Sequence, residues 1–500
     1  MYIDVSSYKG GKRVRIIERQ KINGRWSNRL VKHIGTARDD DELAILRKIA
    51  QTDRVMLSSP NQLELDLGQN SIRGLFSLGI FHHGAELILG DIFDSLGISL
   101  GRLTPLLRLL TIARIIHPAS KRDTASWLQD TLSSSYSLDQ IYRFLDVIYT
   151  HRSQIQTSLR KAVADSYSSS MSYLLYDVTT LHFEIDHEDQ DLSGWAGLRK
   201  RGYSKNHRSD LPQIVLGLCV NELGMPLSYR IYPGNTYEGR TLIDGVEFAR
   251  KQIGADEITV VADAGMLSSS NISLIEDMGM GFIISARIKN LDDRITKQIF
   301  SHNFEQNPIC DLSYKGNRLI VSYSQKRARA DAKRRQASIV RLEKLISQNR
   351  ALRKHQFLEF EVEDKPRLNS KAIEKAALFD GLKGYLTNNQ DLSADIIISH
   401  YKFLPIVEQS FRLTKSDLKI RPSFHQRARR IEAHVILCMI SLCVMRILED
   451  KVRTCGFTYL QALSVISKTN SALIGNERKT HLIPPLYNPE FNAILKAVRD

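Results

Sequence analysis

The spacing of hydrophobic residues changes several times along this chain, and each change marks a predicted segment. In the first 38 residues, apolar and polar positions alternate as in strands over Arg13–Arg19 and Arg29–Ile34. The Asn23-Gly24 pair between them is a strong signal for a two-residue hairpin turn. Arg and Lys dominate the polar positions, so residues 1–38 are expected to form a basic β-hairpin. This hairpin either follows a DNA backbone or is simply solvated.

Residues 39–168 follow a helical period instead. Apolar residues recur every three to four positions, as in Leu106, Leu110 and Ala113. The stretch Pro118–Arg122 interrupts this pattern, and a new helix is predicted from Asp123. Two short helices around a basic turn form either a DNA-binding helix-turn-helix or an ordinary helical bundle. The pattern leaves both open.

Between residues 169 and 289, strand and helix patterns alternate. The expected strands are Tyr173–Phe183, Gln213–Cys219, Leu227–Ile231, Ile258–Ala262 and Gly281–Ala286, and the expected helices are Arg240–Gln252 and Asn271–Met278. The order β-β-β-α-β-α-β is the one that a ribonuclease-H-like core requires. We therefore predict an α/β fold with a mixed-sheet catalytic core, whose second part is expected at residues 381–450.

Residues 290–380 are not required by that core, and we expect them to form an inserted basic β/α domain. Two short strands, Asp311–Tyr314 and Arg318–Tyr323, precede a very basic helix. From Lys326 to Lys354, eleven residues are Lys or Arg and two are acidic. Such a run is either a solvated helix face or a surface that contacts phosphates. The last segment, residues 451–500, is expected to be a helical tail.

The composition favours a globular protein with a polyanionic partner. A chain of 500 residues corresponds to roughly two to four domains, and its 42% hydrophobic residues are ample for packed cores. There are 70 Lys and Arg against 55 Asp and Glu, which gives a net charge of +15. An excess of this sign favours binding to nucleic acid, and a basic surface that serves only solubility is the alternative.

Cysteine spacing and apolar stretches indicate in which cell compartment the protein is expected. The five cysteines form no Cys-x-x-Cys pair and leave one odd, which argues against a disulfide framework or a structural zinc site. No signal peptide is visible at the N-terminus. The longest apolar stretch, Ile431 to Leu448, contains Glu432, His434 and Arg446, so a buried core helix is expected rather than a membrane span. We expect a cytoplasmic protein with no membrane partner.

Three acidic residues lie where a metal-dependent nuclease would need them. Asp177 is inside the first core strand, Asp263 follows the fourth, and Glu408 lies in a helical pattern. A carboxylate among β-branched neighbours is costly to bury unless it is paired or binds a metal. These acids are the candidate catalytic and metal-binding residues of a phosphoryl-transfer site with two Mg²⁺ ions, which Mn²⁺ can replace.

The spacing around Glu408 suggests one functional helix face. Tyr401, Glu408 and Lys415 are seven residues apart, close to two helical turns, so they are expected on the same face. Arg412 lies one turn beyond Glu408. A carboxylate flanked by cations suits a metal beside a phosphate backbone, whereas an ordinary Glu408–Arg412 ion pair is the alternative. Pro405 either begins this helix or kinks it.

Several short motifs, taken in order, resemble the DDE transposases of bacterial insertion sequences. The similar branch carries a Y-x2-R-x3-E-x6-K signature, which here consists of Tyr401, Leu404 in place of Arg, Glu408 and Lys415. Further similar fragments are Tyr176–Thr180, Gly202–Arg208, Asp210–Gln213, Pro233–Glu238, Asp263–Met266 and Arg421-Pro422 followed by His434. Together they cover about residues 170 to 450, over half of the chain.

The resemblance implies roles for the candidate residues. The three acids would be the metal-binding triad of a ribonuclease-H-like domain, and the segment after Arg287 would be its insertion domain. Leu404 removes one expected phosphate contact, and the sequence leaves open whether Arg412 replaces it. The loop after the first core strand either holds DNA or is a structural polar loop. The expected DNA-binding residues are Tyr401, Lys415, Arg412, Lys205 and Arg208.

The function implied by the resemblance is DNA transposition. Such an enzyme cleaves double-stranded DNA at terminal inverted repeats and joins the freed 3′-hydroxyl to target DNA by metal-dependent phosphoryl transfer. We expect a homodimer, because two element ends must be held together, located at the nucleoid of a bacterial cytoplasm. The alternatives are a catalytically idle, domesticated DNA-binding protein and a ribonuclease-H-like nuclease that cuts without joining.

Overall fold

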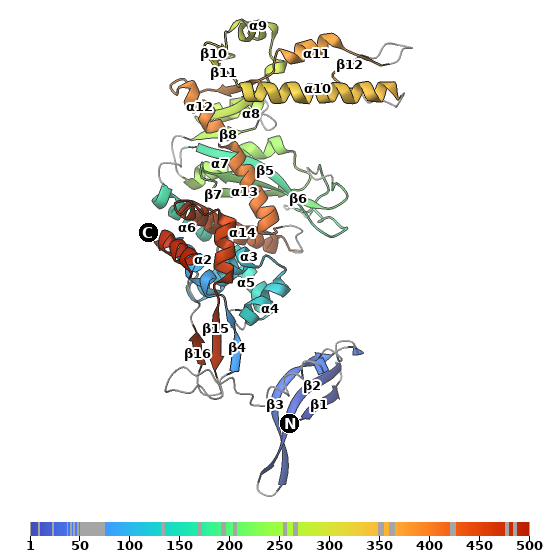
Figure 1. The fold of residues 1–500 in the computed structure, drawn as a ribbon, viewed down its shortest axis with the longest axis vertical. Helices are drawn as coiled ribbons and strands as arrows, with labels where there is room; N and C mark the ends of the chain where they lie inside the picture. Colours follow the sequence, from blue (N-terminus) through green and yellow to red (C-terminus); the bar gives the residue numbers. More distant parts are fainter. Residues whose placement is uncertain are drawn as a thin grey trace. The chain divides into compact units, whose positions relative to one another are not determined.

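The structure is a computed structural model that describes most of the chain and divides into two compact units (Figure 1). The units are Met1–Phe81 with Ser471–Pro485, and His82–Asn470 with Leu486–Asp500. The described residues are 2–8, 11–22, 25–37, 39–40, 43, 46–47, 50, 76–131, 136–167, 173–191, 197–203, 208–253, 258–263, 269–348, 355–359, 366–420, 427–475, 480–483 and 488–499.

The first unit contains two three-stranded antiparallel sheets. In one of them, β2 (Gly11–Ile22) pairs with both β1 (Tyr2–Tyr8) and β3 (Arg25–Ala37). Strands β2 and β3 form a hairpin over the two strands expected there, and its Asn23-Gly24 turn lies outside the described residues. Strand β1 has no counterpart in the sequence prediction. It covers the other edge of β2, where Val14 is fully buried.

The other sheet of this unit joins the two ends of the chain. Strand β15 (Ser471–Gly475) pairs with β4 (Phe76–Phe81) and with β16 (Thr480–Ile483). Residues 451–500, expected to be a helical tail, therefore contain two strands besides the helices α15 (Tyr459–Lys468) and α16 (Pro489–Arg499). Pairing with a distant strand leaves no local periodic signal, which is why periodicity does not predict it.

The helical part of the second unit is built around α14 (Ala428–Arg453). This helix is long and apolar enough to cross a membrane, and 89% of its most apolar window is buried inside the protein. It packs as the sequence predicts for a core helix. Its helical neighbours are α2 (His83–Ser95), α3 (Thr104–Ile116), α5 (Leu138–Thr150), α6 (Arg152–Tyr167), α15 and α16. Helix α4 (Lys121–Thr131) follows the predicted turn after α3 and packs on it.

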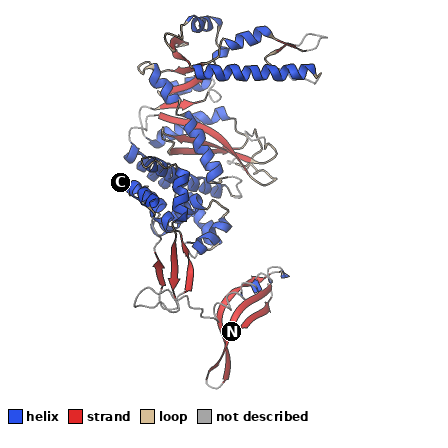
Figure 2. Ribbon diagram, in the orientation of Figure 1, coloured by secondary structure: helices blue, strands red, loops and turns tan. Residues whose placement is uncertain are grey.

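An eight-stranded mixed sheet forms the rest of the second unit's core (Figure 2), in the order β10-β11-β14-β9-β8-β5-β6-β7. Strands β5 (Tyr173–His182), β8 (Thr259–Ala262) and β9 (Gly281–Ala286) run parallel to one another. Strand β6 (Gln213–Val220) pairs antiparallel with β5, and β7 (Pro226–Pro233) pairs antiparallel with β6 at the edge of the sheet. All five strands expected for the core are present, and the sheet is consistent with a ribonuclease-H-like fold.

Helices contact both faces of this sheet. On one face lies α7 (Glu238–Ile253), where the Tyr176 hydroxyl donates a hydrogen bond to the Thr241 carbonyl at 3.0 Å. Helix α13 (Leu404–Arg412) contacts β5 and β6. Helix α8 (Ser269–Asp277) follows β8 and completes the predicted β-β-β-α-β-α-β order.

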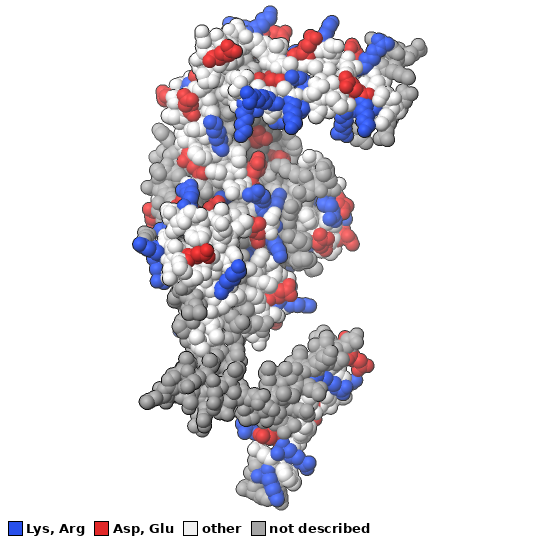
Figure 3. Space-filling view, in the orientation of Figure 1, with Lys and Arg blue, Asp and Glu red and all other residues white. Residues whose placement is uncertain are grey.

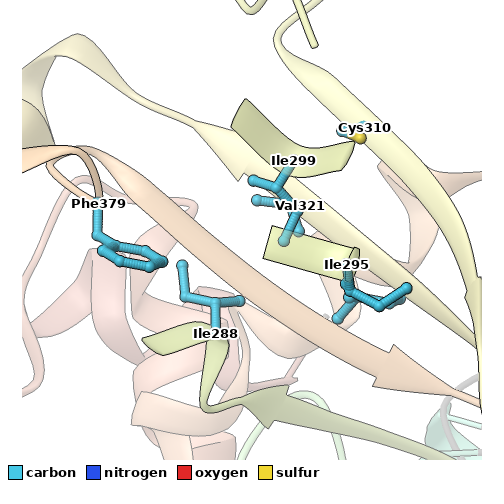
Figure 4. Packing of buried hydrophobic residues seen from close by; sticks show 7 residues of the cluster. Ile288, Ile295, Ile299, Cys310, Val321 and Phe379 are labelled. Carbon is cyan, nitrogen blue, oxygen red and sulfur yellow. The ribbon is translucent and has the colours of Figure 1, made fainter. Parts of the chain in front are cut away.

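The predicted inserted domain shares its sheet with the core. Strands β10 (Ile309–Tyr314) and β11 (Asn317–Tyr323) of this domain pair onto β14 (Leu382–Thr387), which begins the predicted second part of the core and has Gly384 opposite Ala286 of β9. Helix α9 (Asp293–Ser301) packs on these strands in a small apolar cluster (Figure 4), which includes Ile288, Ile295, Ile299, Cys310, Val321 and Phe379.

The predicted basic helix is α10 (Gln325–Ser347), and residues 349–354 of the basic run lie outside the described residues. Leu342 is the only α10 residue that is buried, where it packs with Phe357 and Leu358. The short strands β12 (Leu358–Glu359) and β13 (Arg367–Leu368) and the helix α11 (Ser370–Ala377) follow. The basic side chains of α10 are therefore largely available to solvent or to a ligand.

Candidate active site

The parallel pairing of β5 with β8 brings Asp177 and Asp263 level with each other. In this pairing Leu175 is opposite Val261. The same register, carried two residues further, places Asp177 opposite Asp263, because both strands run in the same direction. Asp177 is half-buried within β5, and Asp263 is exposed directly after the end of β8. Two of the three predicted acids thus lie at the same height on neighbouring strands.

Asp177 faces the side of the sheet that carries the third acid's helix. Successive side chains of a strand point to opposite faces, and Tyr176 points to α7. Thr179, two residues after Asp177 and on its face, accepts a hydrogen bond from Lys415 Nζ. Lys415 lies in a π-helical turn, Leu413–Asp417, that continues α13. The segment with Glu408 therefore packs over the face of β5 that bears Asp177.

The helix that carries Glu408 differs from the one predicted by spacing. Helix α12 (Ala394–Tyr401) ends at Tyr401, and α13 begins at Leu404 with Pro405 in its first turn. Proline suits this position because a first-turn residue has no intrahelical N–H bond to lose. Pro405 therefore begins a new helix. The prediction that Tyr401 and Glu408 share one face of a single helix is wrong.

Tyr401 and Ser285 both bond to the carboxylate of Asp263. The Tyr401 hydroxyl donates to Asp263 Oδ1 at 3.4 Å, and the Ser285 hydroxyl of β9 donates to the same oxygen at 3.2 Å. Burial raises the pKa of Tyr401 to about 12, and the charge of Asp263 acts in the same direction. The phenol is therefore a protonated donor at neutral pH. Tyr401, predicted as a DNA contact, is a direct partner of a candidate catalytic acid.

Lys383 of β14 supplies a positive charge beside this pair. Its Nζ lies 4.2 Å from the centre of the Tyr401 ring, which is a cation–π contact. Burial lowers the pKa of Lys383, and so does the nearby charge of Arg327, whereas Asp263 acts to raise it. Lys383 and Ser285 are not among the residues that the sequence predicts for the site. Neither belongs to a motif, and only strand alternation in β14 and β9 could have indicated their faces.

Glu408 and Arg412 are exposed on α13, while Leu404 is buried at its start. Leu404 therefore belongs to the apolar core and brings no charge to the site. Within the described part of the chain, no group of three or more His, Cys, Asp or Glu lies close enough together to hold a metal ion.

Arg446 of α14 fixes the inner face of α13. Its guanidinium is buried and donates to Ser410 Oγ at 2.9 Å and to the Ile406 carbonyl at 3.3 Å. Gly224, in the β6–β7 turn, has φ +75°, and a Cβ there would lie 2.7 Å from the Ile406 side chain. The turn approaches α13 this closely because the residue is glycine. These contacts set the position of the helix that bears Glu408.

The loop predicted to hold DNA is described only in part. Lys205 lies outside the described residues. Arg208 pairs with Asp210 at 3.1 Å, and this hydrogen bond raises the pKa of the guanidinium. A DNA phosphate would have to compete with Asp210 for Arg208. DNA binding by Lys205, Arg208, Arg412 and Lys415 stays a prediction.

Replacing Arg446 by Met should loosen α13. Ser410 and Ile406 would lose a buried donor, so we expect the free energy of unfolding to fall by about 1–3 kcal/mol. Glu449→Gln is the matched control, because Glu449 pairs with Arg446 Nη1 at 2.8 Å, whereas the bonds to α13 come from Nη2 and would remain. Chemical denaturation measures the free energy of unfolding of both variants. Equal losses for the two variants would show that Arg446 acts through Glu449 and not through α13.

The sequence was also compared with known protein families and structures. The family described as "Transposase DDE domain" matches residues 170–444, which is 275 of the 500 residues. A search of curated proteins found no match. Among solved structures, a piggyBac transposase synaptic complex with hairpin DNA is similar over 77% of this chain and 78% of that chain, at 9% identity and a TM-score of 0.38. That likeness is too distant to support an argument. The family match covers more than half of the chain, which therefore belongs to the transposase DDE domain family.

Proposed function

We propose that this chain is the transposase of a bacterial insertion sequence, from the branch with the Y-x2-R-x3-E-x6-K signature. It cleaves DNA at the terminal inverted repeats of its element and joins the freed 3′-hydroxyl ends to target DNA. One observation carries the proposal beyond family membership. Asp177 in β5 and Asp263, directly after β8, are level when the register of these parallel strands is extended by two residues, and the helix with Glu408 packs on the face that bears Asp177.

The proposed donor set fits a hard divalent cation. Asp177, Asp263 and Glu408 offer only carboxylate oxygens, which suit Mg²⁺ and equally Mn²⁺. When bound, two such ions supply activation of the attacking oxygen and stabilisation of the leaving oxygen. The chain's own contribution is orientation. The hydroxyls of Tyr401 and Ser285 both donate to Asp263 Oδ1, and Arg446 donates to the helix of Glu408.

Cations from other segments would hold the DNA phosphates beside these acids. Leu404 stands where the family signature has Arg, and the positive charge next to Tyr401 comes from Lys383 of β14. Lys415, bonded to Thr179, brings a second charge to the strand that carries Asp177. Positive groups at these places favour a phosphate backbone over a neutral substrate.

The proposed partner is double-stranded DNA, both the element ends and the target. The net charge of +15 supports a polyanionic partner. Joining two ends to one target requires that both ends be held together, so we propose a homodimer. The proposed place of action is the nucleoid in a bacterial cytoplasm.

Single substitutions of the three acids test the catalytic assignment. Asp177→Asn, Asp263→Asn and Glu408→Gln should each reduce cleavage by more than the roughly 10–100-fold that loss of an outer-shell partner costs, while DNA binding persists. Asp277→Asn, at an exposed acid of α8, is the matched control and should cleave normally. The assay uses a duplex with the inverted repeats that flank the gene, Mg²⁺ and a supercoiled target plasmid.

Each other outcome of this assay has a distinct meaning. Normal cleavage by Asp263→Asn would contradict the triad. Cut ends without strand-transfer products would identify a ribonuclease-H-like nuclease that cuts without joining. Binding without any cleavage by the unmodified protein, in Mg²⁺ or Mn²⁺, would identify an idle DNA-binding protein.

Tyr401→Phe separates a positioning role from a DNA contact. Loss of the hydroxyl that bonds Asp263 should raise the Mg²⁺ concentration for half-maximal cleavage by about 10–100-fold, with the Kd for DNA unchanged. Tyr385→Phe is the control, because its ring packs edge-on against Tyr401 at 5.2 Å and no bond from its hydroxyl to Asp263 is found among the described residues. A weaker Kd with unchanged Mg²⁺ dependence would instead support the predicted DNA contact.

A further inference from the structure

A pocket of about 650 Å³ lies between α10 and the strands β9 and β14. Its lining includes Ser285, whose hydroxyl bonds to Asp263, and Lys383, whose ammonium lies over the Tyr401 ring. It also includes Arg327 and Arg334 from α10. The pocket therefore adjoins Asp263, one of the proposed catalytic acids, and extends from there beneath the basic helix.

The lining of this pocket is strongly basic. Figure 3 shows Lys and Arg side chains gathered along α10 and the neighbouring surface. Five basic residues contribute to the pocket against two acids. The basic residues are Lys289, Arg327, Arg334, Arg335 and Lys383, and the acids are Asp331 and Asp380. Such an excess in one concave site attracts an anion.

The two acids are already engaged by two of the arginines. Asp380 forms an ion pair with Arg335, and Asp331 lies 3.6 Å from Arg334. Asp331 also accepts a hydrogen bond from the Gly381 amide at 3.2 Å. For Lys289 and Arg327, no ion pair is found within the described part of the chain. The positive charge of these two residues is thus left for a ligand.

Arg327 and Lys383 are like charges held near each other. The charge of Arg327 is close enough to lower the pKa of Lys383, after the larger effect of burial. Two cations at one site repel unless an anion lies between or beside them. Because Lys383 also contacts Tyr401, the partner of Asp263, this anion position is next to the site of chemistry.

We propose that the pocket beneath α10 binds the phosphodiester backbone of the DNA strand next to the cleavage site, with Arg327 and Lys289 contacting its phosphates. This inference rests on the proposed function and extends it from the scissile bond to the strand beyond. A strand fits better than a small anion, because a pocket of about 650 Å³ is much larger than one phosphate group, and its basic residues come from α10, from β14 and from the segment after β9.

The test compares two arginines of the same helix. Arg327 lines the pocket, whereas Arg329, about 200° further around α10, is exposed and does not. Binding of the fluorescein-labelled end duplex is measured between roughly 50 and 200 mM salt. Arg327→Gln and Lys289→Gln should each lower the slope of log Kd against log salt by about 0.9. Arg329→Gln should leave the slope unchanged.

The outcomes separate this inference from the proposed function. A wild-type slope in Arg327→Gln and Lys289→Gln, in a protein that cuts the duplex, would overturn the pocket inference alone. An equal loss in Arg329→Gln would also overturn it, because the helix would then bind DNA through its outer face. If the unmodified protein neither cuts nor joins the duplex, the proposed function fails, and this inference fails with it.

Discussion

The parallel pairing of β5 with β8 is the constraint on which the proposed site depends. Its register alone decides that Asp177 and Asp263 are level, since a shift by one residue would turn one carboxylate to the opposite face. Apolar runs on both strands bury this pairing between helices. The pairing is therefore held by the core of the unit, and the acids themselves contribute little to it. The proposed site thus gains a fixed position for two carboxylates from strands that would form without them.

The third acid depends on a different kind of contact. Glu408 is exposed, and its helix is placed by buried polar bonds from Arg446 to Ser410 and to the backbone. A buried guanidinium left without hydrogen-bond partners would cost free energy, so these bonds favour a single position of α13 on the core. The sheet adds a further link, because β9 and β14 carry Ser285 and Lys383 to the same place. Both strands belong to the predicted core segments, on either side of the insertion.

The sequence predicts those parts of the fold that have a local signal. The core strands appear as apolar runs, and two acids stand out because carboxylates are rare among β-branched residues. The sequence does not predict the break between α12 and α13, because Pro405 is compatible with either the start of a helix or a kink within one. The pairing of β14 with β9 and of β15 with β4 joins segments far apart in sequence, which periodicity cannot detect. Ser285 and Lys383 were missed for the same reason.

The central claim is that Asp177, Asp263 and Glu408 together hold the metal ions of the reaction. Iron-directed cleavage of the polypeptide tests this most directly, with Fe²⁺ in place of Mg²⁺ and ascorbate with peroxide as the source of radicals. The account predicts backbone cuts near all three acids, suppressed by excess Mg²⁺ and lost in Asp263→Asn. Cuts that avoid one of the three positions, or that persist unchanged in Asp263→Asn, would contradict it.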